Sequence, residues 1–333
     1  MDGGAGDEST IRENLAAFRR WHLRPRQLAG IRTVDLRTRL LGVDVASPVY
    51  ISPMAYQGLL DPYGEAATAR AASAAGMLAM YSTLSTLSLE AISAAAPAGP
   101  RWFQLYLQPE FAATRRLVER AGKAGFKALV LTVDAPVLGP RDRQTHDGVA
   151  IRSPVPIGNG LDIVPPARGP QFEDGLYSFP PDATETWEVL ERLQKVTSLP
   201  IVVKGVLTVE DVRHAVDGGA RAVVLSNHGG RQLDGAVTGL DALPEVVEAV
   251  GSGVEVYVDG GVRRGRDALI ALALGAKGVG LGRPVLWALA AGGEAGVARL
   301  LALFNHELAV SMMLVGRRSI AEIDRSMVSR RPG

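Results

Sequence analysis

The chain has 333 residues, 36 of them basic and 35 acidic, and it contains no cysteine. The balance of charge argues against a nucleic-acid partner, because phosphate binding needs a concentrated positive surface. Without cysteine there are no disulfides, thiolate metal sites or cysteine nucleophiles, and no metal site is predicted. The N-terminus lacks the pattern of a signal peptide, and no run of about 18 apolar residues predicts a membrane span. We therefore expect a cytoplasmic protein without membrane contact.

Short apolar runs alternate with amphipathic segments along most of the chain. Residues 1–47 are expected to cover the fold, with a helix over 7–20 and a hairpin within 21–43. Strands are predicted over residues 49–55, 79–83, 102–107, 128–134, 200–205, 222–226, 254–259 and 277–282. Helices are predicted over residues 64–75, 89–95, 111–124, 187–196, 209–217, 240–250, 266–274 and 288–311.

Eight strands that alternate with helices predict an α/β protein with the TIM (β/α)8 barrel fold. The length suits a single domain over residues 1–333, with the barrel at 48–290 and C-terminal helices at 291–333. Residues 135–184, after the fourth strand, are rich in proline and show little periodicity, which is typical of a lid or binding loop.

The loops that follow the strands of such a barrel build its active face. Every predicted strand end carries polar residues or glycine, which favours a functional barrel over a purely structural one. These residues include Pro53, Ser82, Gln104, Tyr106, Thr132, Asp134, Lys204, Ser226, His228, Arg231, Asp259, Arg263, Gly282 and Arg283.

Lys204 stands in an otherwise apolar strand, where an unpaired buried ammonium would be costly. Its negative partner is either a carboxylate, with a structural role, or an anionic cofactor ring. No Gly-x-Gly-x-x-Gly sequence follows the first strand, which disfavours a nicotinamide site. Arg263 and Arg283 lie beside glycines at the last two strand ends, where barrels commonly bind phosphate. Two solvated arginines near turns are the alternative.

A second group consists of Tyr106, Asp134, Arg141, His228 and Arg231. Two arginines and a tyrosine can hold a small carboxylate that carries an α-hydroxyl group. A histidine between them can act as a general base. The aspartate either fixes the tautomer of that histidine or pairs with an arginine.

Several segments resemble the FMN-dependent (S)-2-hydroxy-acid oxidase and dehydrogenase family, which includes glycolate, lactate and 4-hydroxymandelate oxidases. The resemblance runs from about Gly4 to Ile323, and the most specific motif is SNHGGRQLDG at residues 226–235. Further segments are WFQLYL, LTVDAP, VVKGVLTVEDVRHAV and VDGGVRRGRDALIALALGAKGVGLGRPV. The resemblance implies FMN as cofactor, a small 2-hydroxy acid and O2 as reaction partners, and a homotetramer or octamer.

The resemblance also implies roles for single residues. His228 would be the base and Asp134 its partner, with Tyr106 on the substrate hydroxyl and Arg141 and Arg231 on the carboxylate. FMN would be held by Pro53, Ala55, Ser82, Gln104, Thr132, Lys204, Ser226, Asp259, Gly261, Arg263, Gly282 and Arg283.

The chain departs from the family pattern at two places. The aromatic pair that usually precedes the Gly-Ala-x-Asp-Glu segment would fall before Met1. Either the start codon is wrongly placed, the chain is trimmed, or the enzyme works without that contact, with reduced substrate affinity as the expected cost. Leu84 stands where glycolate oxidases tend to have tryptophan, which leaves room for a larger substrate side chain. We therefore expect oxidation of mandelate or 4-hydroxymandelate, with O2 reduced to H2O2. If Leu84 only fills an apolar wall, the substrate is an aliphatic 2-hydroxy acid.

Three other functions remain open from the sequence. A dehydrogenase would pass the electrons to a quinone or a cytochrome, and a flavin-binding protein would not catalyse a reaction at all. An FMN barrel of another chemistry, such as inosine-phosphate dehydrogenase, is disfavoured because that reaction needs a catalytic cysteine.

Overall fold

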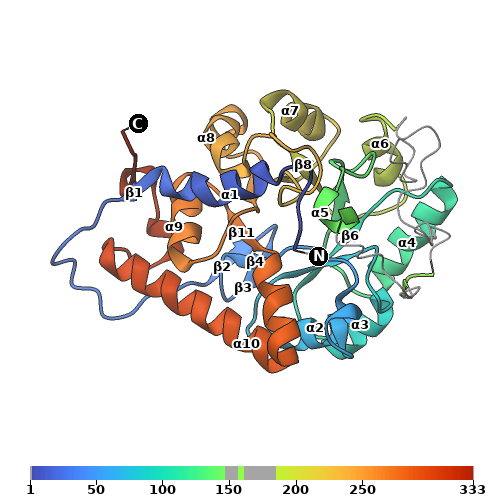
Figure 1. Ribbon diagram of the computed structural model, residues 1–333, viewed down its shortest axis with the longest axis horizontal. Coiled ribbons are helices and arrows are strands. Elements are labelled where there is room, and N and C mark those ends of the chain that lie inside the picture. The colour runs from blue at the N-terminus through green and yellow to red at the C-terminus, as the bar shows by residue number, and fades with distance from the viewer. Residues whose placement is uncertain (1, 147–156, 161–184, 333) are drawn as a thin grey trace.

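A closed barrel of eight parallel strands forms the centre of the protein (Figure 1). The computed structural model describes residues 2–146, 157–160 and 185–332. Strand β11 pairs with β4 through Val279 and Val49 and closes the barrel, so the predicted TIM barrel is confirmed. In barrel order the strands are β4 (Val49–Ile51), β5 (Ala79–Ser82), β6 (Arg101–Leu105), β7 (Leu129–Thr132), β8 (Ile201–Val206), β9 (Ala222–Leu225), β10 (Glu255–Val258) and β11 (Gly278–Leu281).

Helices follow the strands and cover the outside of the barrel. Ser88, Thr208 and Thr238 begin three of them, and each side chain accepts a hydrogen bond from a backbone amide in the first turn. The helices are α2 (Gly64–Ala74), α3 (Leu89–Ala95), α4 (Phe111–Lys123), α6 (Val189–Gln194), α7 (Val209–Asp217), α8 (Gly239–Val250), α9 (Gly265–Ala273) and α10 (Arg283–Leu314). A short helix, α5 (Asp142–His146), follows β7; most of the predicted lid loop, at 147–156 and 161–184, lies outside the described residues.

The N-terminal residues form the expected cover. Helix α1 (Ser9–Arg19) packs on α8, and β2 (Thr38–Leu40) and β3 (Val43–Val45) form a hairpin. Strand β1 (Trp21–Leu23) pairs with β12 (Val328–Arg330). The C-terminal prediction needs correction, because β12 is a strand and short 3-10 turns at Ile320–Glu322 and Arg325–Met327 precede it.

Helix α10 begins at Arg283, five residues before the predicted start. It has the length and apolar composition of a membrane span. However, non-helical backbone at Gly292 and Gly293 divides it, and it packs on α2 and α9. Buried leucines such as Leu301 and Leu308 belong to the core of the protein. Helix α10 is thus partly buried against α2 and α9, while Leu303, Val310 and Leu314 on it are exposed.

Aromatic side chains fill the barrel interior near the N-terminal ends of the strands. Tyr50 and Trp102 both contact the ring of Tyr257 edge to face, at centroid distances of 5.9 and 5.5 Å. The Tyr257 hydroxyl donates to Glu255, which also accepts the Leu41 N–H at 2.8 Å. The β2–β3 hairpin thereby closes the N-terminal end of the barrel, and the opposite end remains for the site.

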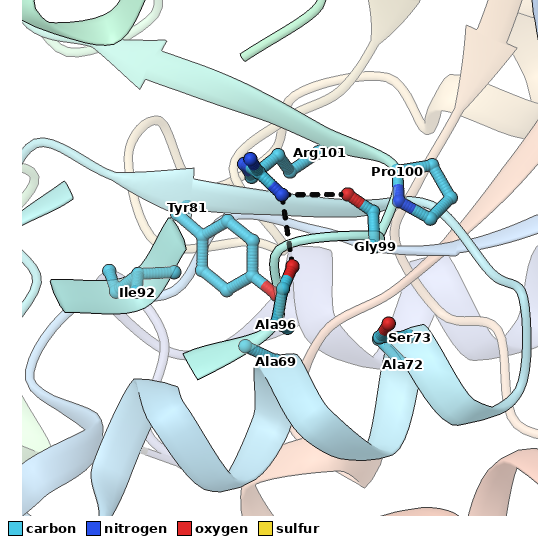
Figure 2. Close-up of a pocket in the computed structure, with 9 residues that line it drawn as sticks. All are labelled: Ala69, Ala72, Ser73, Tyr81, Ile92, Ala96, Gly99, Pro100 and Arg101. Atoms are coloured by element: carbon cyan, nitrogen blue, oxygen red, sulfur yellow. Dashed lines mark hydrogen bonds between the residues drawn. The ribbon is translucent and has the colours of Figure 1, made fainter. Parts of the chain in front are cut away.

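Arg101 starts β6 at the closed end and caps two helices. Its Nη1 donates to the carbonyls of Ala96, Pro97 and Gly99 at 3.0 to 3.1 Å, and its Nη2 donates to the Ala124 carbonyl at 3.0 Å. Ala96 ends α3 and Ala124 ends α4. Figure 2 shows this guanidinium beside Tyr81 in a small cavity between the strands and helix α2.

Replacing Arg101 with methionine should lower the free energy of unfolding by about 2–3 kcal/mol, because the buried carbonyls lose their donor. Chemical denaturation measures this cost. Arg115→Met is the matched control, since Arg115 is exposed and only pairs with Glu119 at 3.7 Å; it should cost less than about 1 kcal/mol. Equal losses in the two variants would contradict the capping role of Arg101.

Candidate active site

Polar side chains at the strand ends form a buried ring around the open mouth of the barrel. On one side the Ser82 hydroxyl donates to Gln104 Oε1, and Gln104 Nε2 donates to Thr132 Oγ1, both at 3.0 Å. All members of the ring are buried although none is apolar. They are Ser52, Ser82, Gln104, Thr132, Lys204, Ser226 and Asp259.

Lys204 and Asp259 place opposite charges in this ring. The Lys204 ammonium donates to Ser226 Oγ at 2.8 Å and lies 3.4 Å from Asp259 Oδ2. Ser52 Oγ donates to the same carboxylate oxygen at 3.3 Å. Lys204 therefore has the carboxylate partner that the sequence left as one of two possibilities.

The ring also has hydrogen-bonding capacity left for a ligand. Asp259 Oδ1 is buried without a hydrogen-bond partner among the described residues. An ammonium has three donors, and the contacts with Ser226 and Asp259 account for two. A flat polar group above the barrel mouth would satisfy both, so these residues fit the ring and ribityl chain of a flavin.

His228 lies beside this ring and holds a strained backbone conformation. Its φ of 57° is left-handed, which costs a residue with a side chain about 1 kcal/mol. Its N–H donates to Ser226 Oγ at 3.1 Å, its Nδ1 lies 2.8 Å from Asp134 Oδ1, and its Nε2 lies 3.4 Å from the Tyr106 hydroxyl. The strained turn thus places the imidazole between a carboxylate and a phenol.

The charge of Asp134 sets the tautomer of this histidine. Burial raises the pKa of Asp134, but the charges of His228 and Lys204 and the hydrogen bond from His228 outweigh that effect and lower it. An ionised carboxylate only accepts hydrogen bonds, so Nδ1 of His228 carries the proton and Nε2 of a neutral imidazole is an acceptor. Burial raises the pKa of the Tyr106 phenol, which stays protonated as a donor.

Gly205 makes room for Asp134. It lies in a bulge of β8 with a φ of 105°, and a Cβ atom there would come within 2.5 Å of Asp134 Cβ and Cγ. Only glycine allows this backbone and this close approach. The glycine after Lys204 is therefore part of the site, although the sequence analysis gave it no role.

Partly buried arginines lie on the open side of His228. Burial, together with the charges of Arg141 and Arg283, lowers the pKa of Arg231 to about 9. Arg231 donates to the Gly3 carbonyl. Arg283 donates to the carbonyls of Asp2 at 3.1 Å and Gly229 at 2.8 Å. The charges of Asp2 and Glu8 offset the burial of Arg283 only in part, since its pKa is still lowered, so the cluster is suited to anions.

Arg263 extends the cluster toward the ends of β10 and β11. Burial and the neighbouring charge of Arg283 lower its pKa. Its guanidinium carbon lies 5.0 Å from the centroid of the Trp287 ring, a cation–π contact that holds the side chain. Gly282 is the residue that caps the start of α10, directly before Arg283. The sequence analysis missed Trp287, which no local pattern connects with Arg263.

The glycine loop after β10 is also shaped by helix α1. A Cβ atom on Gly261 would lie 2.0 Å from the Asn14 carbonyl oxygen. Asn14 and Asn227 exchange two side-chain hydrogen bonds of 2.9 Å. Helix α1 is thereby fixed against both the loop that carries His228 and the loop that carries Gly261.

Asp234 ends the motif that contains His228, and it caps α1. Its carboxylate accepts the backbone amides of Ser9 at 3.1 Å and Thr10 at 2.8 Å. Partial burial raises the pKa of Asp234, but these hydrogen bonds outweigh it and hold the pKa well below its usual range. The sequence analysis missed this role, because the cap and its helix lie more than two hundred residues apart.

The other predicted residues lie in the loops after the first two strands. Pro53 and Ala55 lie between β4 and a 3-10 turn, Gln57–Leu59. Leu84 follows β5 and is buried, and its N–H donates to Ser82 Oγ at 3.0 Å.

Comparison with known proteins identifies the class. The FMN-dependent dehydrogenase family matches residues 1–330. The L-lactate oxidase of Nostoc sp. is 48% identical, over 98% of this chain and 91% of that protein. Human 2-hydroxyacid oxidase 2 is 46% identical, over 98% and 92%. A mandelate oxidase variant solved with (S)-mandelic acid superposes with a TM-score of 0.89 at 42% identity, over 99% of this chain and 92% of that one. Another mandelate oxidase structure contains an FMN adduct.

The chain belongs to the FMN-dependent dehydrogenase family. It is an FMN-dependent oxidase that converts 2-hydroxy acids to 2-oxo acids.

Asp234→Ala should lower the free energy of unfolding by about 1 kcal/mol, the usual cost of losing a helix cap. Since the folded-state pKa is depressed, this contribution is complete above the ordinary value of about 3.9 and decreases as the pH falls below it. Denaturation at pH 7 and pH 3 measures the change. Asp7→Ala, at an exposed position, is the control. A stability difference that grows toward low pH would contradict the cap.

Proposed function

We propose that the protein oxidises an (S)-2-hydroxy acid with an aromatic side chain, mandelate or 4-hydroxymandelate, and that O2 is reduced to H2O2. The observation that carries the proposal is the placement of His228 Nε2 toward the Tyr106 hydroxyl, next to partly buried arginines. The similarity to mandelate oxidases and the size of Leu84 support the aromatic substrate. Bound FMN supplies the electron acceptor for the substrate and the reductant for oxygen.

The arginine cluster binds the substrate carboxylate in this proposal. The charge of Arg141 contributes to the lowered pKa of Arg231, and one carboxylate between the two guanidinium groups would relieve that repulsion. The Tyr106 hydroxyl then faces the α-hydroxyl group of the substrate. These contacts hold the α-carbon of the substrate beside His228. The site thus promotes the reaction by placing the substrate next to the base.

His228 accepts the proton that leaves the substrate, at Nε2. The imidazolium that forms is stabilised by the ionised Asp134, 2.8 Å from Nδ1. Because Asp134 also faces Lys204, the carboxylate stays charged before and after the proton moves. His228 therefore takes up the proton at Nε2 while Asp134 remains an ionised partner of Nδ1.

FMN is held by the ring of polar side chains and by the outer arginines. Lys204 faces the edge of the flavin ring that becomes negative on reduction, and Arg263 and Arg283 bind the phosphate beside the glycine loops. The remaining contacts come from Pro53, Ala55, Ser82, Gln104, Thr132, Ser226, Asp259, Gly261 and Gly282. Assembly into four or eight copies and a cytoplasmic location remain predictions.

His228→Asn should slow anaerobic flavin reduction by (S)-mandelate about 10²–10⁴-fold, since the base is lost. FMN affinity, measured by fluorescence titration, should stay at the parent value, because His228 contributes only its backbone amide to the polar ring. Stopped-flow absorbance follows the reduction. Reduction at the parent rate would rule out His228 as the base.

Leu84→Trp should lower kcat/KM for (S)-mandelate by about tenfold or more, because the larger ring competes with the substrate side chain. For (S)-lactate the change should stay within about threefold. Leu84→Met, of similar volume, is the control. Peroxide yield against dye reduction, measured in the same assays, separates an oxidase from a dehydrogenase. A variant that keeps the parent preference for mandelate would show that Leu84 does not face the substrate.

A further inference from the structure

Glu65 is a fully buried carboxylate in the first turn of α2. Its Oε1 accepts the backbone amides of Gln57 at 3.1 Å and Thr86 at 2.9 Å. Its Oε2 accepts the Thr86 hydroxyl and the Leu87 amide, the latter at 3.3 Å. None of these donors belongs to α2, so the carboxylate does not serve as a cap for its own helix.

The donors come from the two loops that follow β4 and β5. Further hydrogen bonds join the same loops: the Gly58 amide donates to Thr86 Oγ1 at 3.1 Å, and Tyr56 N–H donates to the Leu84 carbonyl at 3.1 Å. Tyr56 has a φ of 57°, a conformation that needs outside support in a residue with a large side chain. Glu65 supplies that support, since it binds the residue after Tyr56.

Tyr56 lies on the side of the arginines and Tyr106. Burial raises the pKa of the Tyr56 phenol, and the charge of Arg141 opposes the rise. The Tyr56 phenol in turn raises the pKa of Tyr106. The backbone agrees with this placement, because Tyr56 N–H donates to the Leu84 carbonyl and Leu84 N–H donates to Ser82 Oγ in the polar ring.

We propose that Tyr56 is a specificity-determining residue of the substrate site and that Glu65 is the positioning residue that holds Tyr56 and Leu84 together as one wall. This inference rests on the proposed function and adds residues to it. The wall contacts the substrate side chain, so an aromatic 2-hydroxy acid depends on it more than lactate does. The Tyr56 hydroxyl adds a donor next to Arg141 for the carboxylate.

Glu65→Gln tests the positioning role. An amide cannot accept from all of these donors, so at least one backbone amide loses its partner and the two loops separate. The apparent dissociation constant of (S)-mandelate, from anaerobic flavin reduction, should rise about tenfold. The limiting reduction rate should stay within about twofold, and the constant for (S)-lactate should change less. Glu90→Gln, the same substitution in an exposed pair with Arg120, should leave both substrates unaffected.

Tyr56→Phe removes only the hydroxyl and tests its proposed contact with the substrate carboxylate. It should raise the apparent dissociation constant of mandelate in the parent protein and have a smaller effect in the Glu65→Gln background, because the ring is no longer held in place. Thr86→Val removes a hydrogen bond to Glu65 and repeats the test if Glu65→Gln does not fold. FMN affinity should remain at the parent value in all of these variants.

The outcomes separate this inference from the proposed function. Suppose that mandelate reduces the parent protein, but that Glu65→Gln changes the apparent dissociation constants of mandelate and lactate equally or leaves both unchanged. Glu65 is then not a positioning residue for the substrate wall. Additive effects of Glu65→Gln and Tyr56→Phe would refute the coupling between them. If no 2-hydroxy acid reduces the parent protein, the proposed function itself is wrong and this inference is overturned with it.

Discussion

The buried carboxylate of Asp134, placed between His228 and Lys204, is the interaction on which the site depends. It stays ionised because these two groups offset the cost of burial. The Asp134 side chain fits only because residue 205 is glycine. The backbone carbonyl of Asp134 accepts a hydrogen bond from Gln232 Nε2 at 2.9 Å. Residues from β8 and from the loops after β7 and β9 thus meet at the carboxylate of Asp134. A single change at any of these positions would alter the tautomer or the orientation of the histidine.

The N-terminal helix belongs to the site as much as the barrel does. Asp234 caps α1, and the paired amides of Asn14 and Asn227 fix it across the loop that carries His228. The same loop holds His228, the proposed base, in a strained conformation. Strain of this kind persists only where surrounding contacts determine it, and α1 supplies several of them. The cover over the barrel is therefore part of the catalytic geometry.

The alternation of apolar runs was enough to predict the barrel, because each strand and helix is specified by its own residues. The residues at the strand ends could be predicted equally well, since a parallel barrel brings the ends of its strands together regardless of the loop conformations. The roles of Asp234, Glu65 and Trp287 could not be predicted, because each acts on a segment distant in sequence. The predicted start of α10 is five residues late, because Arg283 was assigned to a strand end, although Pro284 suits the first turn of a helix.

The central claim is that this site removes two electrons and two protons from an (S)-2-hydroxy acid. The most direct measurement mixes the FMN-loaded protein with (S)-mandelate or (S)-lactate in the absence of oxygen and follows the flavin absorbance. We expect rapid loss of the oxidised flavin band, faster with mandelate than with lactate. Bound FMN that stays oxidised with both acids would contradict the account.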